Sequence, residues 1–395
     1  MPPRRLAVAS SSARWLAESA RRSGPRAVAL DLFGDEDTRR AAAAWYRIGE
    51  PGTMRIDVGT LFQILRRLYR AGRIDGWVPG AGFDGIASVW SPAPLCPPLI
   101  GNSADTVAAV REPARFFALL NSLAIPHPAI TLMRPAQPEG WLRKDAGGSG
   151  GLHIRRMQKA DRPQPSGIYY QRECDGQSLS ALFAADRHRA RVIAFSEQLL
   201  EPLGHSPYVF CGAVGPVNLA PPAATQLQEA IDALVDATGL IGLNSLDFLW
   251  DGKRFNVLEI NPRPSATLAL YDVCGSGPFG SLLRMHAELC FGATLPDRAS
   301  LLVSPAATAH ARGARIVFAN ADRLISAIAS TRLAASTWIH DIPSPNTVVA
   351  CGEPLCTVSA VATDVDTVRA CLARRAHQVL SMTENRRDVE SCPSA

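Results

Sequence analysis

The stretch Leu243–Ser265, LNSLDFLWDGKRFNVLEINPRPS, decides the fold of this chain and the site that we expect it to carry. Two apolar-rich runs, Leu243–Trp250 and Phe255–Ile260, flank Asp251-Gly252, a dipeptide typical of hairpin turns. Polar and charged residues interrupt both runs. Carboxylates among large apolar side chains are costly unless they are paired or bind a metal ion. The hairpin therefore predicts a polar site on one face of a sheet.

Four polar side chains of this hairpin suit a metal and phosphate site. Glu259, Asn261 and Arg263 alternate along the second run, so they share one face if the strand stays extended. Together with Asp247 they supply two carboxylates, one amide and one guanidinium, which suit a divalent cation and phosphate oxygens. An ordinary hairpin with a structural ion pair is the alternative interpretation.

The length of the turn decides whether Asp247 shares that face. A two-residue turn would pair Asp247 with Asn256 and place Glu259 on the opposite face. A three-residue loop over residues 251–253 would pair Asp247 with Val257 and bring both carboxylates to one face. We expect the three-residue loop.

Length and composition describe a globular protein of more than one domain. A chain of 395 residues exceeds one typical core, so two or three domains are expected. The hydrophobic fraction is 47% and the charged fraction 19%, which is ordinary for a globular chain. The 41 Lys and Arg residues exceed the 36 Asp and Glu residues by five, and the arginines are scattered. We therefore expect anionic small molecules such as nucleotides as ligands, and no nucleic-acid partner.

Two further features bear on location. No apolar run approaches the roughly 18 residues of a membrane span, and the basic N-terminal run is interpreted as part of the fold, so no membrane partner is expected. The nine cysteines are spread singly, without a C-x-x-C pair. This spacing favours reduced thiols and a cytoplasmic protein.

The chain opens with a pattern typical of α/β proteins. Short strands over Leu6–Ala9 and Ala27–Leu32 flank a helix over Ala13–Arg22, which predicts a β-α-β unit. The run Gly80–Gly85 matches G-x-G-x-x-G, but it lies far from the first βα turn and opens no clear helix, so we interpret it as structural turns. A final helix is predicted over Val365–Met382.

A second informative stretch begins at Trp141. A strand ending in Lys144 runs into a glycine-rich loop, Gly147–Gly151, whose backbone N–H groups can approach phosphate oxygens while the lysine adds charge. The loop also matches G-x-S-x-G, which raises a serine hydrolase with Ser149 as nucleophile. That interpretation needs a helix directly after the serine, whereas Leu152–Met157 is strand-like. A plain flexible loop is a further alternative.

A third stretch, Ile168–Gly176, reads as a strand that ends in a short connector. Backbone groups of such a connector, here around Cys174, can hydrogen-bond an adenine ring. The side chains of Gln171 and Glu173 could accept from the exocyclic amine of the base.

Taken in this order, the three stretches resemble ATP-grasp enzymes. In that family a lysine-ended strand and a glycine-rich loop cover the triphosphate, a connector holds adenine, and an acidic strand followed by E-x-N-x-R binds magnesium and the reacting phosphoryl group. The resemblance places Lys144 and Arg263 in catalytic positions and Arg115 near the usual first phosphate-binding lysine. It implies nucleotide contacts from Lys144, Gly147, Gly148, Ser149, Gly150, Gly151, Gln171, Glu173 and Cys174, and metal ligands from Asp247, Glu259 and Asn261.

The resemblance also implies an architecture and an activity. The expected fold class is α/β (α+β overall), an ATP-grasp fold with a Rossmann-like N-terminal domain at 1–100, the ATP-grasp domain at 101–299, a small β-rich C-terminal domain at 300–383 and a disordered tail at 384–395. The implied reaction uses ATP and Mg²⁺ (or Mn²⁺) to join a small-molecule carboxylate to an amine through an acyl phosphate, in a homodimer. A small-molecule kinase and a non-catalytic ATP-binding protein are the alternatives.

A narrower similarity is carried by Asp31-Leu32-Phe33-Gly34-Asp35 together with the C-terminal part of the chain. These stretches are similar to ATP-grasp proteins of pterin cofactor assembly in methylotrophic bacteria. The similarity implies a role in cofactor biosynthesis.

Overall fold

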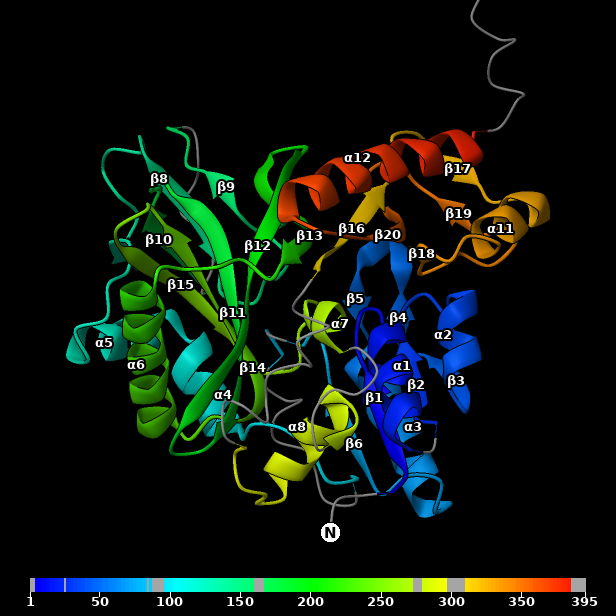
Figure 1. The fold of residues 1–395 in the computed structure, drawn as a ribbon, viewed down its shortest axis with the longest axis horizontal. Coiled ribbons are helices and arrows are strands. Elements are labelled where there is room, and N and C mark those ends of the chain that lie inside the picture. The colour runs from blue at the N-terminus through cyan, green and yellow to red at the C-terminus, as the bar shows by residue number, and fades with distance from the viewer. Residues whose placement is uncertain are drawn as a thin grey trace, which may run out of the picture.

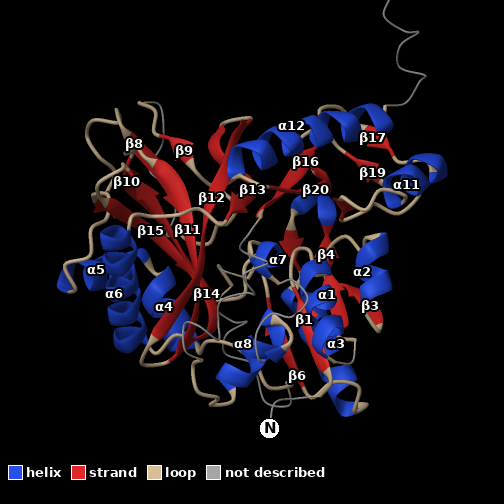
Figure 2. Ribbon diagram, viewed as in Figure 1, coloured by secondary structure: helices blue, strands red, loops and turns tan. Residues whose placement is uncertain are grey.

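The computed structural model describes residues 4–24, 26–83, 85–86, 96–159, 167–272, 279–296 and 310–384. Within these ranges the chain forms a parallel sheet, a small antiparallel sheet and a large antiparallel sheet, with helices packed against them (Figures 1 and 2). The mixed α/β class predicted from the sequence is confirmed. All but the first residue of the predicted tail lies outside the described residues.

The N-terminal part is a four-stranded parallel sheet in the order β3-β2-β1-β6. Its central strands are buried along nearly their whole length because helices cover the sheet. The predicted β-α-β unit is confirmed, and polar residues follow the carboxyl ends of β1 and β2. The elements are β1 (Leu6–Ala9), α1 (Arg14–Ser23), β2 (Val28–Asp31), α2 (Glu36–Ala41), β3 (Ala44–Arg47), β4 (Gly49–Glu50), the 3-10 turn η1 (Pro51–Thr53), β5 (Arg55–Ile56), α3 (Val58–Arg70) and β6 (Gly76–Pro79).

The middle of the chain begins with two helices and a small sheet in the order β7-β10-β8-β9. Strand β10 pairs with β8 so that Tyr169 lies opposite Lys144, which fixes the predicted phosphate lysine beside the predicted connector. The elements are α4 (Ala104–Arg111), α5 (Pro113–Ser122), β7 (Ile130–Thr131), β8 (Trp141–Asp145), β9 (Arg155–Arg156) and β10 (Ile168–Arg172).

The large sheet runs without a break in the order β15-β14-β11-β12-β13-β16-β20-β18. The pairing of β13 with β16 joins the middle of the chain to its C-terminal part in one sheet. Its strands are β11 (Gln177–Asp186), β12 (Ala190–Leu203), β13 (Ser206–Gly215), β14 (Ile241–Trp250), β15 (Phe255–Asn261), β16 (Ala311–Phe318), β18 (Ile339–His340) and β20 (Pro354–Ala362), with the separate pair β17 (Arg323–Leu324) and β19 (Val348–Val349).

Two long amphipathic helices cover this sheet. Helix α6 (Pro221–Thr238) buries Leu227, Ile231 and Leu234 against the strands on one side of the molecule, and α12 (Val365–Met382), which has the predicted bounds, lies across β16 and β20 (Figure 1). The remaining helices are α7 (Leu268–Tyr271), α8 (Leu282–Cys290) and α11 (Ala327–Ala334). Among the described residues, none of the helices combines the length and the apolar character that a membrane crossing requires.

A buried asparagine ties the helices before the small sheet to the central hairpin. Asn102 accepts a hydrogen bond from the Ile241 backbone N–H at 2.8 Å. Its side-chain amide donates to the Asn244 side chain and to the Pro262 carbonyl, both at 2.8 Å. Because the residue has no exposed surface, these contacts replace the water that its amide would otherwise bind. The network fixes both ends of the β14–β15 hairpin.

Candidate nucleotide and metal site

A cavity of about 1390 Å³ lies where the three sheets meet. The glycine-rich loop and the β14–β15 hairpin line one part of it, and the loops that follow β1, β2 and β6 line another. With the exception of Arg115, the residues that the sequence predicts at the nucleotide or metal site line this cavity: Lys144, Gly147, Gly148, Ser149, Gly150, Gly151, Gln171, Glu173, Cys174, Asp247, Glu259, Asn261 and Arg263.

The predicted three-residue turn of the hairpin is wrong. Trp250 pairs with Phe255, so the loop contains the four residues 251–254. The Asp251 carboxylate closes this loop by accepting hydrogen bonds from the backbone N–H groups of Lys253 at 2.8 Å and Arg254 at 2.7 Å. Aspartate side chains in turns often accept hydrogen bonds from nearby backbone N–H groups in this way, and these bonds stabilise the longer loop.

Asp247 and Glu259 nevertheless lie on one face, because a β-bulge shifts the pairing of β14 with β15 by one residue. Phe248 pairs with Val257, whereas Asp247 pairs with Glu259, so Leu258 is the extra residue of the bulge. Residues directly opposite each other in an antiparallel pair point to the same face. Asp247 and Glu259 both line the cavity.

The surroundings of Asp247 favour a cation. Its side chain is 7% exposed and accepts hydrogen bonds from the Ser180 hydroxyl at 2.6 Å and the Asn261 amide at 3.1 Å. Burial, together with the negative charge of Glu259, raises the pKa of Asp247 to about 7. A divalent cation between the two carboxylates would remove this repulsion, and carboxylate and amide oxygens are the donors that Mg²⁺ prefers. The residues present therefore fit such an ion.

Positive groups surround the acidic pair. Arg263 is 6% exposed and donates to the Asn261 side-chain oxygen at 3.1 Å. Lys144, at the end of β8, is 7% exposed and donates to the Gln171 side-chain oxygen at 2.6 Å. Burial lowers the pKa of the Lys144 ammonium, and the nearby Arg111 guanidinium lowers it further. An anionic ligand would be bound by several desolvated donors at once.

The side chains of Gln171 and Glu173, which the sequence predicts near adenine, bind other residues of the protein in this structure. The Gln171 side-chain oxygen accepts a hydrogen bond from Lys144. Glu173 forms an ion pair with Arg156 at 2.9 Å and accepts a hydrogen bond from the Tyr208 hydroxyl. Cys174 is exposed in the connector between β10 and β11. All three residues line the cavity, so their backbone groups remain close to the site.

The glycine-rich loop is docked on strand β13. The Phe210 N–H donates to the Gly150 carbonyl at 2.9 Å, and Gly151 adopts φ +79° with its α-carbon packed against the Tyr208 carbonyl. A side chain at position 151 would overlap that carbonyl, so glycine is required there. The loop after Ser149 continues into β9 and not into a helix, which removes the support for the serine-hydrolase alternative.

The sequence prediction missed two residues of the site. Arg111, at the end of α4, donates to the Glu259 carboxylate at 2.8 Å and to the Gly148 carbonyl at 3.2 Å. Arg115, the predicted candidate, instead pairs with Glu112 at 3.7 Å on the surface. In the sequence, Arg111 is marked only by its position: it is a basic residue at the end of a helix, directly before Glu112-Pro113.

His153 lies against Gly148, and its Nδ1 is buried without a hydrogen-bond partner among the described residues.

The fold and the site define a class of protein: a nucleotide-binding α/β protein with an acidic hairpin and a glycine-rich loop that face one cavity. Comparison with family models is more specific, because residues 114–267 match the model of the ATP-grasp domain. This segment is therefore similar to the ATP-grasp domain, in agreement with the resemblance that the motifs of the sequence carry.

Solved structures share the whole architecture. Biotin carboxylase from Campylobacter jejuni, in complex with β,γ-ATP, superposes with a TM-score of 0.70 at 13% identity, covering 98% of this chain and 96% of that chain. L-amino acid ligase from Bacillus licheniformis gives 0.66 at 12% identity, with 96% and 98% covered. N5-carboxyaminoimidazole ribonucleotide synthetase from Thermotoga maritima gives 0.61 at 12%, with 95% and 98% covered. A search of curated proteins by sequence gives no match.

Proposed function

We propose that the protein is an ATP-dependent ligase that activates a small-molecule carboxylate as an acyl phosphate and joins it to an amine. The observation that carries the proposal is the direct opposition of Asp247 and Glu259 across the hairpin, in a cavity that also contains Lys144 and Arg263. Structural neighbours of the same fold include an L-amino acid ligase and a synthetase. The products would be ADP, phosphate and an amide.

The basic residues of the site would bind phosphate groups and neutralise charge. Lys144 precedes the glycine-rich loop and Arg111 donates to its Gly148 carbonyl, so both can neutralise phosphate oxygens as charge redistributes in phosphoryl transfer. Arg263 can bind the acyl phosphate and the oxyanion that forms when the amine attacks. The docked Gly147–Gly151 loop would keep water away from the acyl phosphate, which hydrolysis would otherwise destroy.

Asp247, Glu259 and Asn261 would hold Mg²⁺ or Mn²⁺. Such an ion would neutralise part of the negative charge of the phosphate groups. The contacts of Asn261 support this role, because its amide donates to Asp247 and its oxygen accepts from Arg263. The network therefore links the predicted metal ligands to the predicted phosphate contact.

Glu259→Gln tests the proposal. In the wild type, phosphate release should require ATP, a divalent ion, a carboxylate and an amine together, measured across a panel of acids and amines that includes amino acids and pterin-related compounds. The variant should lose this release because it removes one charge of the metal site. Glu229→Gln, an exposed position on α6, is the matched control and should keep wild-type rates. Near-normal turnover by Glu259→Gln would contradict the assignment.

Product analysis distinguishes the alternatives. A ligase yields ADP, phosphate and an amide, whereas a small-molecule kinase yields ADP and a phosphorylated compound without free phosphate. A non-catalytic ATP-binding protein yields neither. The presence of both carboxylates, Asn261 and Arg263 in one cavity favours catalysis, since nucleotide binding alone does not need all four.

The sequence supports further proposals about context. The scattered cysteines support a cytoplasmic location, and the similarity of the segment Asp31–Asp35 supports a role in cofactor biosynthesis. A homodimer is the assembly that the resemblance implies, and light scattering coupled to size-exclusion chromatography tests it. A mass of one chain would exclude the dimer.

A further inference from the structure

A second cluster of charged groups lies away from the hairpin, and three of its members, Arg14, Asp35 and Asp341, line the cavity. It lies where the loops after β1 and β2 meet the segment between β18 and β20. Asp31, Asp35, Asp37 and Asp341 come together here around one buried arginine, Arg14. Four carboxyl groups share one guanidinium here, so burial and the charge of Asp341 raise the pKa of both Asp35 and Asp37. The cluster has no part in the nucleotide chemistry described above.

Asp31 has a structural role. Its buried carboxylate accepts hydrogen bonds from the backbone N–H groups of Ala13 at 3.0 Å and Gly34 at 2.9 Å, and from the Trp45 indole at 2.7 Å. These three donors close the loops after β1 and β2. Asp31 therefore has its donors within the protein and does not need a ligand.

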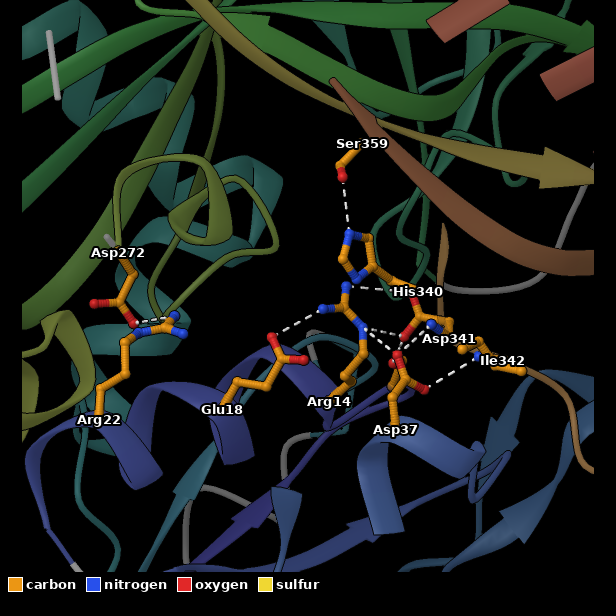
Figure 3. Close-up of polar contacts among 10 residues, drawn as sticks. Arg14, Glu18, Arg22, Asp37, Asp272, His340, Asp341, Ile342 and Ser359 are labelled. Atoms are coloured by element: carbon orange, nitrogen blue, oxygen red, sulfur yellow. Dashed lines mark hydrogen bonds and ion pairs between the residues drawn. The ribbon is translucent and has the colours of Figure 1, made fainter. Parts of the chain in front are cut away.

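Asp37 and Asp341 hold the N-terminal and C-terminal parts together. Asp37 accepts from the backbone N–H groups of Asp341 at 2.8 Å and Ile342 at 3.1 Å. Asp341 accepts from the Arg14 guanidinium at 2.9 Å, and Arg14 also pairs with Glu18 at 3.0 Å (Figure 3). The guanidinium is thus the cation of this group. Glu18, Asp37 and His340 have ligand atoms close enough for a metal ion, but Arg14 pairs with both of the carboxylates.

Asp35 differs from the other three carboxylates. Its side chain is 7% exposed, lines the cavity and receives no hydrogen bond from any described residue. It directly precedes helix α2, where aspartate normally caps the helix, yet its carboxylate makes no capping hydrogen bond. Burial raises the pKa of Asp35 well above its usual value, and the charges of Asp341 and Asp31 raise it further. A cation beside Asp35 would stabilise the ionised form of this unpaired carboxyl group, so its position in the cavity points to a cationic ligand.

We propose that Asp35 binds a positively charged amino group of the substrate, which makes the amine partner of the ligase a cationic compound. This inference rests on the proposed function. A single carboxylate with open lone pairs suits an ammonium, because a divalent metal ion needs several oxygen ligands and the neighbouring carboxylates are already engaged. Ser10, Ser11 and Phe33 line the same cavity, so both polar and apolar residues are available to a bound amine.

The test measures binding of matched amines and alcohols to the full-length protein by calorimetry, with Mg·ADP present and absent. The probes are 2-phenylethylamine with 2-phenylethanol, and 1,4-diaminobutane with 1,4-butanediol. At neutral pH the amines should bind and the alcohols should not. Asp35→Asn should weaken amine binding at least about tenfold, as expected for a lost charge-assisted hydrogen bond. Asp236→Asn, an exposed aspartate on α6 that lies away from the cavity, should bind the amines like the wild type.

Three results would overturn the proposal: no amine binds, alcohols bind as well as amines, or Asp35→Asn binds amines like the wild type. Unchanged Mg·ADP binding by Asp35→Asn shows that the variant is folded, and Asp35→Glu, which keeps the charge, should retain part of the affinity. If amines bind through Asp35 while no carboxylate supports phosphate release, the ligase function fails and the amine site stands. If phosphate release occurs but Asp35→Asn leaves the KM for the amine unchanged, the ligase function stands and the amine site fails.

Discussion

Binding of a divalent ion at the Asp247–Glu259 pair should release a proton. The pKa of Asp247 is raised to about 7 by burial and by the charge of Glu259, so the residue is partly protonated at neutral pH. A metal ion needs the ionised carboxylate. Affinity should therefore be highest above about pH 7 and should fall as the pH drops through the pKa. The perturbation is a change of pH, with Mn²⁺ as the probe.

The magnitude follows from the fraction of Asp247 that is ionised. With a pKa of about 7, roughly nine-tenths of the carboxyl groups are ionised at about pH 8 and one-tenth at about pH 6. The affinity for Mn²⁺ should fall about tenfold between these values, which corresponds to about 1.4 kcal/mol. The folded pKa lies above the unfolded one, so the contribution of this group to stability decreases as the pH rises from about 4 to about 7. Bound metal should therefore stabilise the protein most at the alkaline end.

Electron paramagnetic resonance of unbound Mn²⁺ measures this affinity directly. Asp247→Asn is the control, because an amide has no proton to release, and its residual Mn²⁺ binding should lose the pH dependence over this range. Calorimetry in buffers of different ionisation enthalpy should show about half a proton released per Mn²⁺ at about pH 7. Equal affinity at both pH values, or an unchanged pH dependence in Asp247→Asn, would refute the place of Asp247 in the metal site.

Further predictions concern other residues of the site and its support. Lys144→Met should raise the KM for ATP and lower phosphate release by about a hundredfold or more in steady-state assays, because a desolvated charge that meets phosphate oxygens is lost. Gly151→Ala should weaken ATP binding in calorimetry because the added methyl group overlaps the Tyr208 carbonyl, whereas Gly252→Ala, with φ +93° and no neighbour within 4 Å, should cost only about 1 kcal/mol of stability. Asn102→Ala should lower the free energy of unfolding in urea by about 2–4 kcal/mol, since it leaves the groups that it binds buried without a partner; a loss below about 0.5 kcal/mol would contradict this.

The hairpin shows how far local sequence patterns can be followed. Alternation along the second run correctly placed Glu259, Asn261 and Arg263 in one cavity. The turn was predicted one residue too short, because the preference of Asp251 to bind its own backbone outweighs the two- and three-residue turn patterns. The bulge at Leu258 then restored the register. The common face of the two carboxylates was therefore predicted correctly for an incorrect reason, since no residue pattern in this strand signals a bulge.

Contacts between residues that lie far apart in the chain could not be predicted from local sequence patterns. Arg111 meets Glu259, 148 residues later in the chain, only because helix α4 ends beside the hairpin. Arg115 matches the expected position by spacing alone, but it lies in α5, beyond the break at Glu112, and pairs with Glu112 on the surface. Helical periodicity predicts which residues share a face, whereas the packing of the helix on the sheet decides which face meets the cavity.

The two ends of the segment Asp31–Asp35 carry the same side chain and have different surroundings. The sequence places both residues near the carboxyl end of a strand, where acids often bind ligands. Asp31 loses that potential because Trp45 and two backbone groups supply its donors. Asp35 keeps it because the nearby arginine, Arg14, is engaged by Asp341, which lies more than 300 residues away. The C-terminal part of the chain thus leaves one N-terminal carboxylate available, so the selectivity for a cationic substrate depends on both parts being assembled.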